Sequence, residues 1–208
     1  MSPSKILSIH HPDAIPAAIK IIQNSGTIVI PTDTIYGIAA DAFSPHGIQK
    51  IYDAKERPEE KALPVLIGHI DQLDLLLRFV SDDVLRIAAA FWPGPLTLVL
   101  PKGSNVPSDL SPYPTIGVRM PDLAFTLNLI QKTGPLAATS ANLSGGSNPT
   151  TVQEVLAQLG ERADLILDGG PSPGPVASTV VDATTSELKI LREGPISLEN
   201  LNNVLNKE

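Results

Sequence analysis

Residues 27–37 read Thr-Ile-Val-Ile-Pro-Thr-Asp-Thr-Ile-Tyr-Gly, an apolar run that passes directly into a turn of small polar side chains. The apolar part, residues 27–30, has the β-branched composition of a buried strand. The turn over residues 31–37 therefore lies at a strand end, where open α/β sheets bind their ligands. Its hydroxyl groups and main chain suit a small polar ligand, but the same residues also suit an Asx or Ser/Thr turn that only closes the strand.

Outward from this stretch, short β-rich runs alternate with helical patterns along the whole sequence. We expect helices over residues 13–24, 47–54, 71–80, 81–91, 122–132 and 151–159 and from 197 onward, with Asp13, Thr150 or Thr151, and Ser197 as N-caps. We expect further strands over residues 63–67, 96–100, 115–119, 136–139, 165–167, 179–181 and 188–191. Because the alternation is not a strict βαβ repeat and no linker divides the chain, residues 1–208 are predicted to form one α/β domain around a mixed, twisted sheet.

The composition excludes several classes of protein. The 208 residues contain no cysteine, which excludes a disulfide scaffold, a thiolate metal site and a cysteine nucleophile. The formal net charge of −7 makes the chain a poor general binder of nucleic acid or anionic membrane, so any basic site must be local. No apolar run approaches the ~20 residues of a membrane span and no secretory leader is evident, which favours the cytoplasm.

Familiar catalytic and nucleotide-binding motifs are missing from the sequence. There is no G-x-x-x-x-G-K-[ST], no G-x-G-x-x-G, no G-x-S-x-G and no H-E-x-x-H. The four histidines have no metal-ligand spacing beyond the doublet at residues 10–11, so no protein-bound metal site is expected.

Three other features could bind an anion. Residues 55–61, Lys-Glu-Arg-Pro-Glu-Glu-Lys, present three cations on an irregular segment, although their glutamates could equally neutralise them as surface ion pairs. Residues 140–149, rich in hydroxyl groups, amides and glycine, lead toward a helix N-terminus or form a solvated loop. Arg119 and Arg192 each end a predicted strand, where a guanidinium binds carboxylate or phosphate, or makes a structural ion pair.

Taken together, these segments resemble the YrdC/TsaC family of L-threonylcarbamoyladenylate synthases. The segments that carry the resemblance, in the family's order, are PTDTIYG at 31–37, KERP at 55–58 with Lys61, WPGPLT at 92–97, GVRMP at 117–121, SANLSG at 140–145, STVVD at 178–182 and LREG at 191–194. The resemblance implies a twisted α/β sheet with flanking helices around a large electropositive cavity. It also implies a cytoplasmic enzyme that condenses L-threonine, bicarbonate or CO2, and ATP into threonylcarbamoyl-AMP, releasing pyrophosphate.

The resemblance also assigns roles residue by residue. L-threonine would be held by Thr34, Leu66, Arg119, Ala138 and Ser178, and ATP by Arg57, Lys61, Thr115, Ser140, Asn142, Asn148 and Arg192. Lys55, Arg57 and Lys61 would be catalytic, acting on the triphosphate, while Lys55 and Asn142 would shape its surroundings. This chain departs from the family pattern at Ala62, where proline is frequent, and at Asn148, where serine is frequent.

The implied chemistry fits the missing motifs. Carbamate formation from an amine and CO2 needs no protein nucleophile, and attack on the α-phosphorus needs positioning and charge stabilisation, with Mg²⁺ brought in by ATP. The product would feed N6-threonylcarbamoyladenosine formation at position 37 of tRNAs that read ANN codons, through downstream transfer proteins. Direct tRNA binding is expected to be weak or absent. The alternatives are a carbamoyl-adenylate-forming domain and an RNA-binding or ribosome-assembly module.

Overall fold

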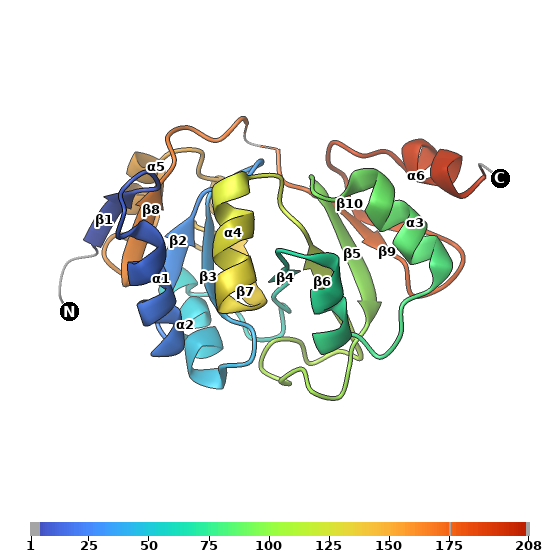
Figure 1. Ribbon diagram of the computed structural model, residues 1–208, viewed down its shortest axis with the longest axis horizontal. Helices are drawn as coiled ribbons and strands as arrows, with labels where there is room; N and C mark the ends of the chain where they lie inside the picture. The colour runs from blue at the N-terminus through green and yellow to red at the C-terminus, as the bar shows by residue number, and fades with distance from the viewer. Residues whose placement is uncertain (1–4, 175, 207–208) are drawn as a thin grey trace.

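The computed structural model describes residues 5–174 and 176–206 and places its strands in one ten-stranded sheet (Figure 1). The order across the sheet is β1-β8-β2-β3-β7-β4-β6-β5-β9-β10. The strands are β1 (Lys5–Ser8), β2 (Ile28–Ile30), β3 (Gly37–Asp41), β4 (Val65–Leu66), β5 (Leu96–Pro101), β6 (Thr115–Arg119), β7 (Leu136–Ser140), β8 (Leu165–Asp168), β9 (Thr179–Asp182) and β10 (Lys189–Arg192).

The sheet is mixed, as the sequence predicts. Strands β1, β8 and β2 run parallel, as do β4 with β6 and β5 with β9. The remaining neighbours are antiparallel, including the β2–β3 and β3–β7 pairs on either side of the PTDTIYG turn. Because β3 returns antiparallel to β2, the turn over residues 31–36 connects two adjacent central strands and is fixed at both ends.

Helices cover both faces of the sheet. They are α1 (Ala14–Gln23), α2 (Pro45–Lys55), α3 (Asp82–Phe91), α4 (Ala124–Thr133), α5 (Val152–Leu159) and α6 (Leu198–Leu205), with a 3-10 helix, η1 (Ile70–Leu75). Figure 1 shows α1 and α4 side by side in front of β2, β3 and β7, where they share one apolar cluster. A second, larger cluster lies on the opposite face and includes side chains of α2, α3, α5 and α6.

The central strands contribute side chains to both apolar clusters, because successive side chains of a strand point to opposite faces of the sheet. Ile28 and Ile30 of β2 belong to the α1–α4 cluster, and Val29 between them belongs to the other. In β7, Leu136 and Ala138 likewise face α1 and α4, while Ala137 faces away. A strand that is buried on both faces reads as a continuous apolar run, which is the pattern of residues 27–30.

Several predicted elements differ from the observed ones. The predicted helix over 71–80 is wrong, because η1 ends at Leu75 and Leu77 then forms a bridge to Lys102. The strand predicted over 63–67 shortens to β4, since Pro64 has no N–H and the N–H of Leu63 bonds to Leu110. Strands β1 and β3 were not predicted at all.

The predicted helix caps are confirmed at two of three places. Thr151 and Ser197 each accept the N3 amide and form capping boxes, at α5 and α6. Asp13 is the N-cap residue of α1, but its side chain makes no capping bond because its backbone is not extended.

Candidate active site

A cavity of about 370 Å³ opens between the central strands and the β5–β6–β9 part of the sheet. Nine predicted site residues line it: Thr34, Arg57, Leu66, Arg119, Ala138, Ser140, Asn148, Ser178 and Arg192. Four predicted site residues are not in the lining: Lys55, Lys61, Thr115 and Asn142. The lining within the described chain contains three arginines and no aspartate or glutamate. The positively charged side chains of the lining are therefore Arg57, Arg119 and Arg192.

The PTDTIYG turn is held by its own threonines. The Oγ1 of Thr32 accepts the amides of Thr34 and Ile35 at 3.1 and 3.2 Å, donates to the carbonyl of Ile35 at 2.7 Å, and lies 3.0 Å from the Oγ1 of Thr34. The Ser/Thr turn that the sequence allows therefore forms. It also places the buried Thr34 hydroxyl at the cavity wall, so the two interpretations of this segment are compatible.

Tyr36 links this turn to the loop that follows β8. Its hydroxyl donates to the carbonyl of Gly170 at 2.6 Å and accepts the amide of Gly169 at 3.0 Å. Burial raises the pKa of Tyr36, and the amide of Gly169 partly opposes that shift. The phenol therefore stays protonated and fixes the loop that follows β8.

Arg119 leaves the end of β6 and is held by three partners. Its Nε donates to the carbonyl of Gly94 at 3.0 Å, Nη1 to the Oγ1 of Thr34 at 2.9 Å, and Nη2 to the Oδ1 of Asp33 at 2.5 Å. Burial lowers the pKa of Arg119 from its ordinary value, and the Asp33 carboxylate opposes that shift. All three segments that meet here carry motifs of the resemblance: the turn over residues 31–37, the loop over residues 92–95, and the end of β6 with Arg119.

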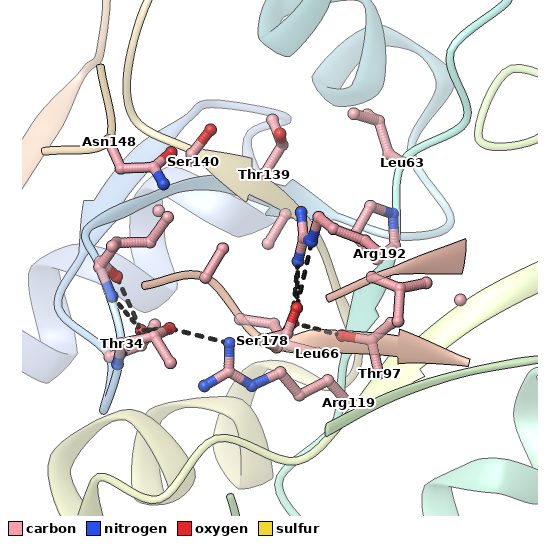
Figure 2. Close-up of a pocket in the computed structure, with 18 of the residues that line it drawn as sticks. Thr34, Leu63, Leu66, Thr97, Arg119, Thr139, Ser140, Asn148, Ser178 and Arg192 are labelled. Atoms are coloured by element: carbon pink, nitrogen blue, oxygen red, sulfur yellow. Dashed lines mark hydrogen bonds between the residues drawn. The ribbon is translucent and has the colours of Figure 1, made fainter. Parts of the chain in front are cut away.

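Ser178 lies between Arg192 and Arg119 in the view of Figure 2. The Oγ of Ser178 lies 2.8 Å from the Oγ1 of Thr97, and Arg192 donates to both the carbonyl oxygen and the Oγ of Ser178, at 2.7 and 3.1 Å. Gly194 makes this contact possible, because a Cβ there would lie 2.7 Å from the carbonyl carbon of Ser178. In Figure 2, Asn148 and Ser140 lie on one side of the view and Arg119 on the other.

The cations of the segment at residues 55–61 have different positions and different roles. Glu56 ends α2 in the left-handed conformation, so the chain turns and Arg57 points its guanidinium to the carbonyls of Lys61 and Ala62, at 3.2 and 3.1 Å. Arg57 lines the cavity, whereas Lys61 is exposed and lies outside the lining. Within the described residues, no ion pair forms between the glutamates and the cations of this segment, and Glu56 pairs instead with Arg162 at 2.8 Å.

Lys55 is buried, with 1% of its surface exposed, and does not reach the cavity. Its Nζ donates to the carbonyl oxygens of Ser140 and Asn142, the latter at 2.5 Å, and lies 3.4 Å from the Oδ1 of Asn142. Asn142 in turn donates to the carbonyls of Leu143 and Gly146, at 2.9 and 2.8 Å. Burial, with a smaller effect of Arg57, lowers the pKa of Lys55 to about 7. The structure therefore gives both residues a positioning role in the SANLSG loop.

The predicted site residues do not include Asp33, Tyr36 or Thr97, although the sequence singles out the turn that contains the first two. Each lies inside a quoted motif, but only the fold reveals what it touches. Thr97 lies between Leu96 and Leu98 of β5, so its side chain points to the face of the sheet opposite theirs, where it lines the cavity. This alternation is the signal in the sequence that could have identified Thr97. No local signal identifies Asp33 as the partner of an arginine 86 residues away.

Residues 20–194 match the model of the Sua5/YciO/YrdC proteins, whose description is "Telomere recombination". The chain belongs to the Sua5/YciO/YrdC family. The match includes all nine predicted residues that line the cavity, together with Lys55 and Asn142.

Relatives of this family member carry the name of one enzyme. A Bacillus subtilis protein named threonylcarbamoyl-AMP synthase is 38% identical over 205 residues, which cover 96% of this chain and 58% of the relative. A Mycobacterium tuberculosis protein, provisionally given the same name, is 35% identical over 190 residues, covering 91% of this chain and 88% of the relative. The chain therefore spans nearly the whole of one relative and about three fifths of the other.

A solved structure shows the same fold. The Pyrococcus abyssi Sua5 protein, in a crystal structure with L-threonine, superposes with a TM-score of 0.89 at 36% identity, over 92% of this chain and 57% of that one. The expected fold, a twisted mixed sheet with flanking helices, is thereby confirmed. Within the described residues, no helix is long and apolar enough to cross a membrane.

Proposed function

We propose that this chain forms L-threonylcarbamoyl-AMP and pyrophosphate from L-threonine, bicarbonate or CO2, and ATP. One observation carries the proposal most directly. A single cavity joins the hydroxyls of Thr34 and Ser178 to three arginines from separate segments, in a chain whose relatives are named for this reaction. The reaction transfers an adenylyl group, which makes the protein a nucleotidyltransferase.

We assign the threonine half of the cavity to Arg119, Thr34, Ser178, Leu66 and Ala138. An arginine has five N–H groups, and Arg119 uses three on Gly94, Thr34 and Asp33, which leaves two for the α-carboxylate of a substrate. The hydroxyls of Thr34 and Ser178 suit the substrate hydroxyl. Apolar contact from Leu66 and Ala138 suits its methyl group. The relative from P. abyssi, crystallised with L-threonine, supports this half of the assignment.

We assign the nucleotide half to Arg57, Arg192, Ser140 and Asn148. Within the described residues, Arg57 and Arg192 donate to neutral oxygens and make no ion pair, so their charge is available to a phosphate. Lys61 can reach a triphosphate only as an exposed side chain on the adjacent segment, and Thr115 stands at the opposite end of β6 from Arg119. Lys55 and Asn142 act on this half through the loop that they hold.

Magnesium would enter with ATP. The described residues include no group of three His, Cys, Asp or Glu side chains that could hold a metal ion, so phosphate oxygens and water would supply its ligands. When bound, the ion neutralises charge on the triphosphate.

The chain's own residues position the reactants. The threonine amine adds to CO2 with loss of a proton and gives a carbamate, and a carbamate oxygen then attacks the α-phosphorus as pyrophosphate leaves. Arg119 fixes the carboxylate that does not react, which orients the amine. Arg57 and Arg192 stabilise charge on the phosphates during the displacement. Neither step forms a covalent bond to the protein.

The product is a reactive mixed anhydride and must be passed to an acyl-transfer step. We infer that transfer proteins carry the threonylcarbamoyl group to N6 of the adenosine at position 37 of tRNAs that read ANN codons. The net charge of −7 supports weak or absent direct binding of tRNA by this chain.

The test is identification of the product by mass spectrometry after incubation with ATP, Mg²⁺, bicarbonate and L-threonine. The proposal predicts an adenylate with the mass of threonylcarbamoyl-AMP. The same assay with carbamoyl phosphate in place of bicarbonate and threonine tests a carbamoyl-adenylate-forming enzyme. A carbamoyl adenylate in that arm, with no product in the first, would contradict the proposal.

A further inference from the structure

The three arginines of the cavity have different partners. Arg119 contacts a carboxylate, since its Nη2 lies 2.5 Å from the Oδ1 of Asp33. Arg57 donates to the carbonyls of Lys61 and Ala62, and Arg192 to the carbonyl and hydroxyl oxygens of Ser178. Across the described part of the chain, Arg119 is thus the cavity arginine that makes an ion pair. One of the three charges is compensated and two are not.

Asp33 does not itself face the cavity. It is absent from the lining, and its side chain is 13% exposed. The neighbouring residues Thr32 and Thr34 fix the turn around it through the bond between their hydroxyls. The guanidinium of Arg119 bonds to Asp33 while its other atoms reach Thr34 and Gly94. Asp33 therefore acts on any substrate through Arg119 and not by contact.

The ion pair makes the charge of the cavity uneven, with one neutral part and one positive part. The Arg119–Asp33 pair is neutral as a unit, whereas Arg57 and Arg192 present two uncompensated charges in the same cavity. Arg192 is close enough to lower the pKa of Arg119, after the larger effects of burial and of Asp33. Without Asp33, the cavity would therefore be a continuous cluster of three cations, which binds a polyphosphate at either end.

The charges of the two substrates match those of the two parts of the cavity. L-threonine is a zwitterion with no net charge, whereas ATP and pyrophosphate carry several negative charges. A neutral site with free N–H donors still binds one carboxylate by hydrogen bonds, but it has no net attraction for a polyanion.

We propose that Asp33 is a specificity-determining residue that keeps phosphate groups out of the threonine half of the cavity by neutralising Arg119. This inference rests on the proposed function, because it takes threonine and a polyphosphate as the two ligands. In this role Asp33 contacts neither substrate. It gives selectivity against phosphate by removing the attraction that the charge of Arg119 would otherwise have for it.

The experiment measures L-threonine affinity by isothermal titration, without and with saturating inorganic pyrophosphate. The variants are Asp33→Asn, which keeps an oxygen acceptor for Arg119 but removes the charge, and Asp33→Glu, which keeps the charge. Asp83→Asn is the matched control, because it removes the carboxylate of a solvent-exposed pair with Arg86 on α3, and Asp83 is not part of the cavity lining.

In the wild type and in Asp83→Asn, we expect pyrophosphate to leave threonine affinity within about twofold, because the ligands occupy separate halves. In Asp33→Asn, we expect pyrophosphate to bind about tenfold more tightly and to weaken threonine binding by about tenfold, since a charge now faces it at short range. Asp33→Glu should keep most of the wild-type independence.

Two results would overturn the inference. The first is competition between pyrophosphate and threonine already in the wild type, a result that does not depend on whether Asp33→Asn folds. The second is an Asp33→Asn protein in which threonine affinity remains independent of pyrophosphate. A wild-type protein that binds no threonine at all would instead contradict the proposed function.

Discussion

The ammonium group of Lys55 donates to the main-chain carbonyl oxygen of Asn142 at 2.5 Å, so one buried cation ties the end of α2 to the SANLSG loop. The amide of Ser144 returns a bond to the carbonyl of Lys55 at 2.9 Å. Lys55 and Arg57 are two residues apart, yet the first holds a loop and the second lines the cavity. The KERP segment therefore combines a structural lysine with an arginine assigned to phosphate.

Replacing Lys55 by methionine should destabilise the protein by about 2 kcal/mol, because two buried carbonyl oxygens lose a charged donor. Lys61→Met is the matched control, since Lys61 is exposed, and it should change the free energy of unfolding by less than about 0.5 kcal/mol. Urea denaturation of both variants provides the measurement. Equal stability of the two variants would show that Lys55 does not hold the loop.

The stability of the wild type should increase as the pH rises above 7. The pKa of Lys55 is about 7 in the folded protein, mainly because of burial, against an ordinary value of 10.5. The unfolded chain therefore binds more protons between these two values, and deprotonation favours the folded state. Between pH 7 and 9, the free energy of unfolding of the wild type should gain up to about 1 kcal/mol per pH unit over that of Lys55→Met. Parallel curves for the two proteins would contradict a lowered pKa.

The sequence predicts the fold and part of the site because both depend on local patterns. The central strand β2 and the turn after it are evident from an apolar run over residues 28–30 that ends at proline. Strand β3 was missed because Gly-Ile-Ala-Ala-Asp contains little β-branched sequence and forms a strand only between β2 and β7. The distribution of roles among Lys55, Arg57 and Lys61 could not be predicted, since it depends on a left-handed residue at Glu56 and on contacts with a loop about 85 residues away.

Gly194→Ala should weaken the binding of both substrates. A Cβ at this position would lie 2.7 Å from the carbonyl carbon of Ser178 and 2.8 Å from the carbonyl oxygen of Ala177. The main chain must move, which displaces Ser178 and its bonds to Arg192 at a cost of about 1–3 kcal/mol. Gly174→Ala is the control, because its added Cβ meets no atom within 4 Å. Thermal unfolding and titration with each substrate compare the two, and identical behaviour would rule out this packing argument.

Arg119→Lys should reduce L-threonine affinity by at least about tenfold. Lysine keeps the charge and can still pair with Asp33, but one ammonium cannot reproduce the bonds that Arg119 makes to Gly94, Thr34 and Asp33. Because the net charge of this half is unchanged, ATP affinity should stay within about twofold. Isothermal titration of both ligands tests this. A selective loss of ATP binding would show that Arg119 binds ATP and that its assignment to L-threonine is wrong.

The substrate hydroxyl should be required more strictly than its methyl group. The hydroxyls of Thr34 and Ser178 would lose a partner with valine, which should therefore react slower by several orders of magnitude. Serine loses only a methyl group, so its kcat/KM should fall by the equivalent of about 1–3 kcal/mol. Rates of pyrophosphate release with the three amino acids provide the comparison, and equal rates for valine and threonine would refute the assigned roles of the two hydroxyls.

Release of pyrophosphate from ATP by the purified wild-type protein tests the central claim most directly, with L-threonine and bicarbonate each omitted in turn. The proposed function predicts pyrophosphate release when ATP, L-threonine and bicarbonate are all present, and a fall to background when any one of them is missing. Release that continues without L-threonine, or a complete reaction mixture that yields no pyrophosphate, would contradict it.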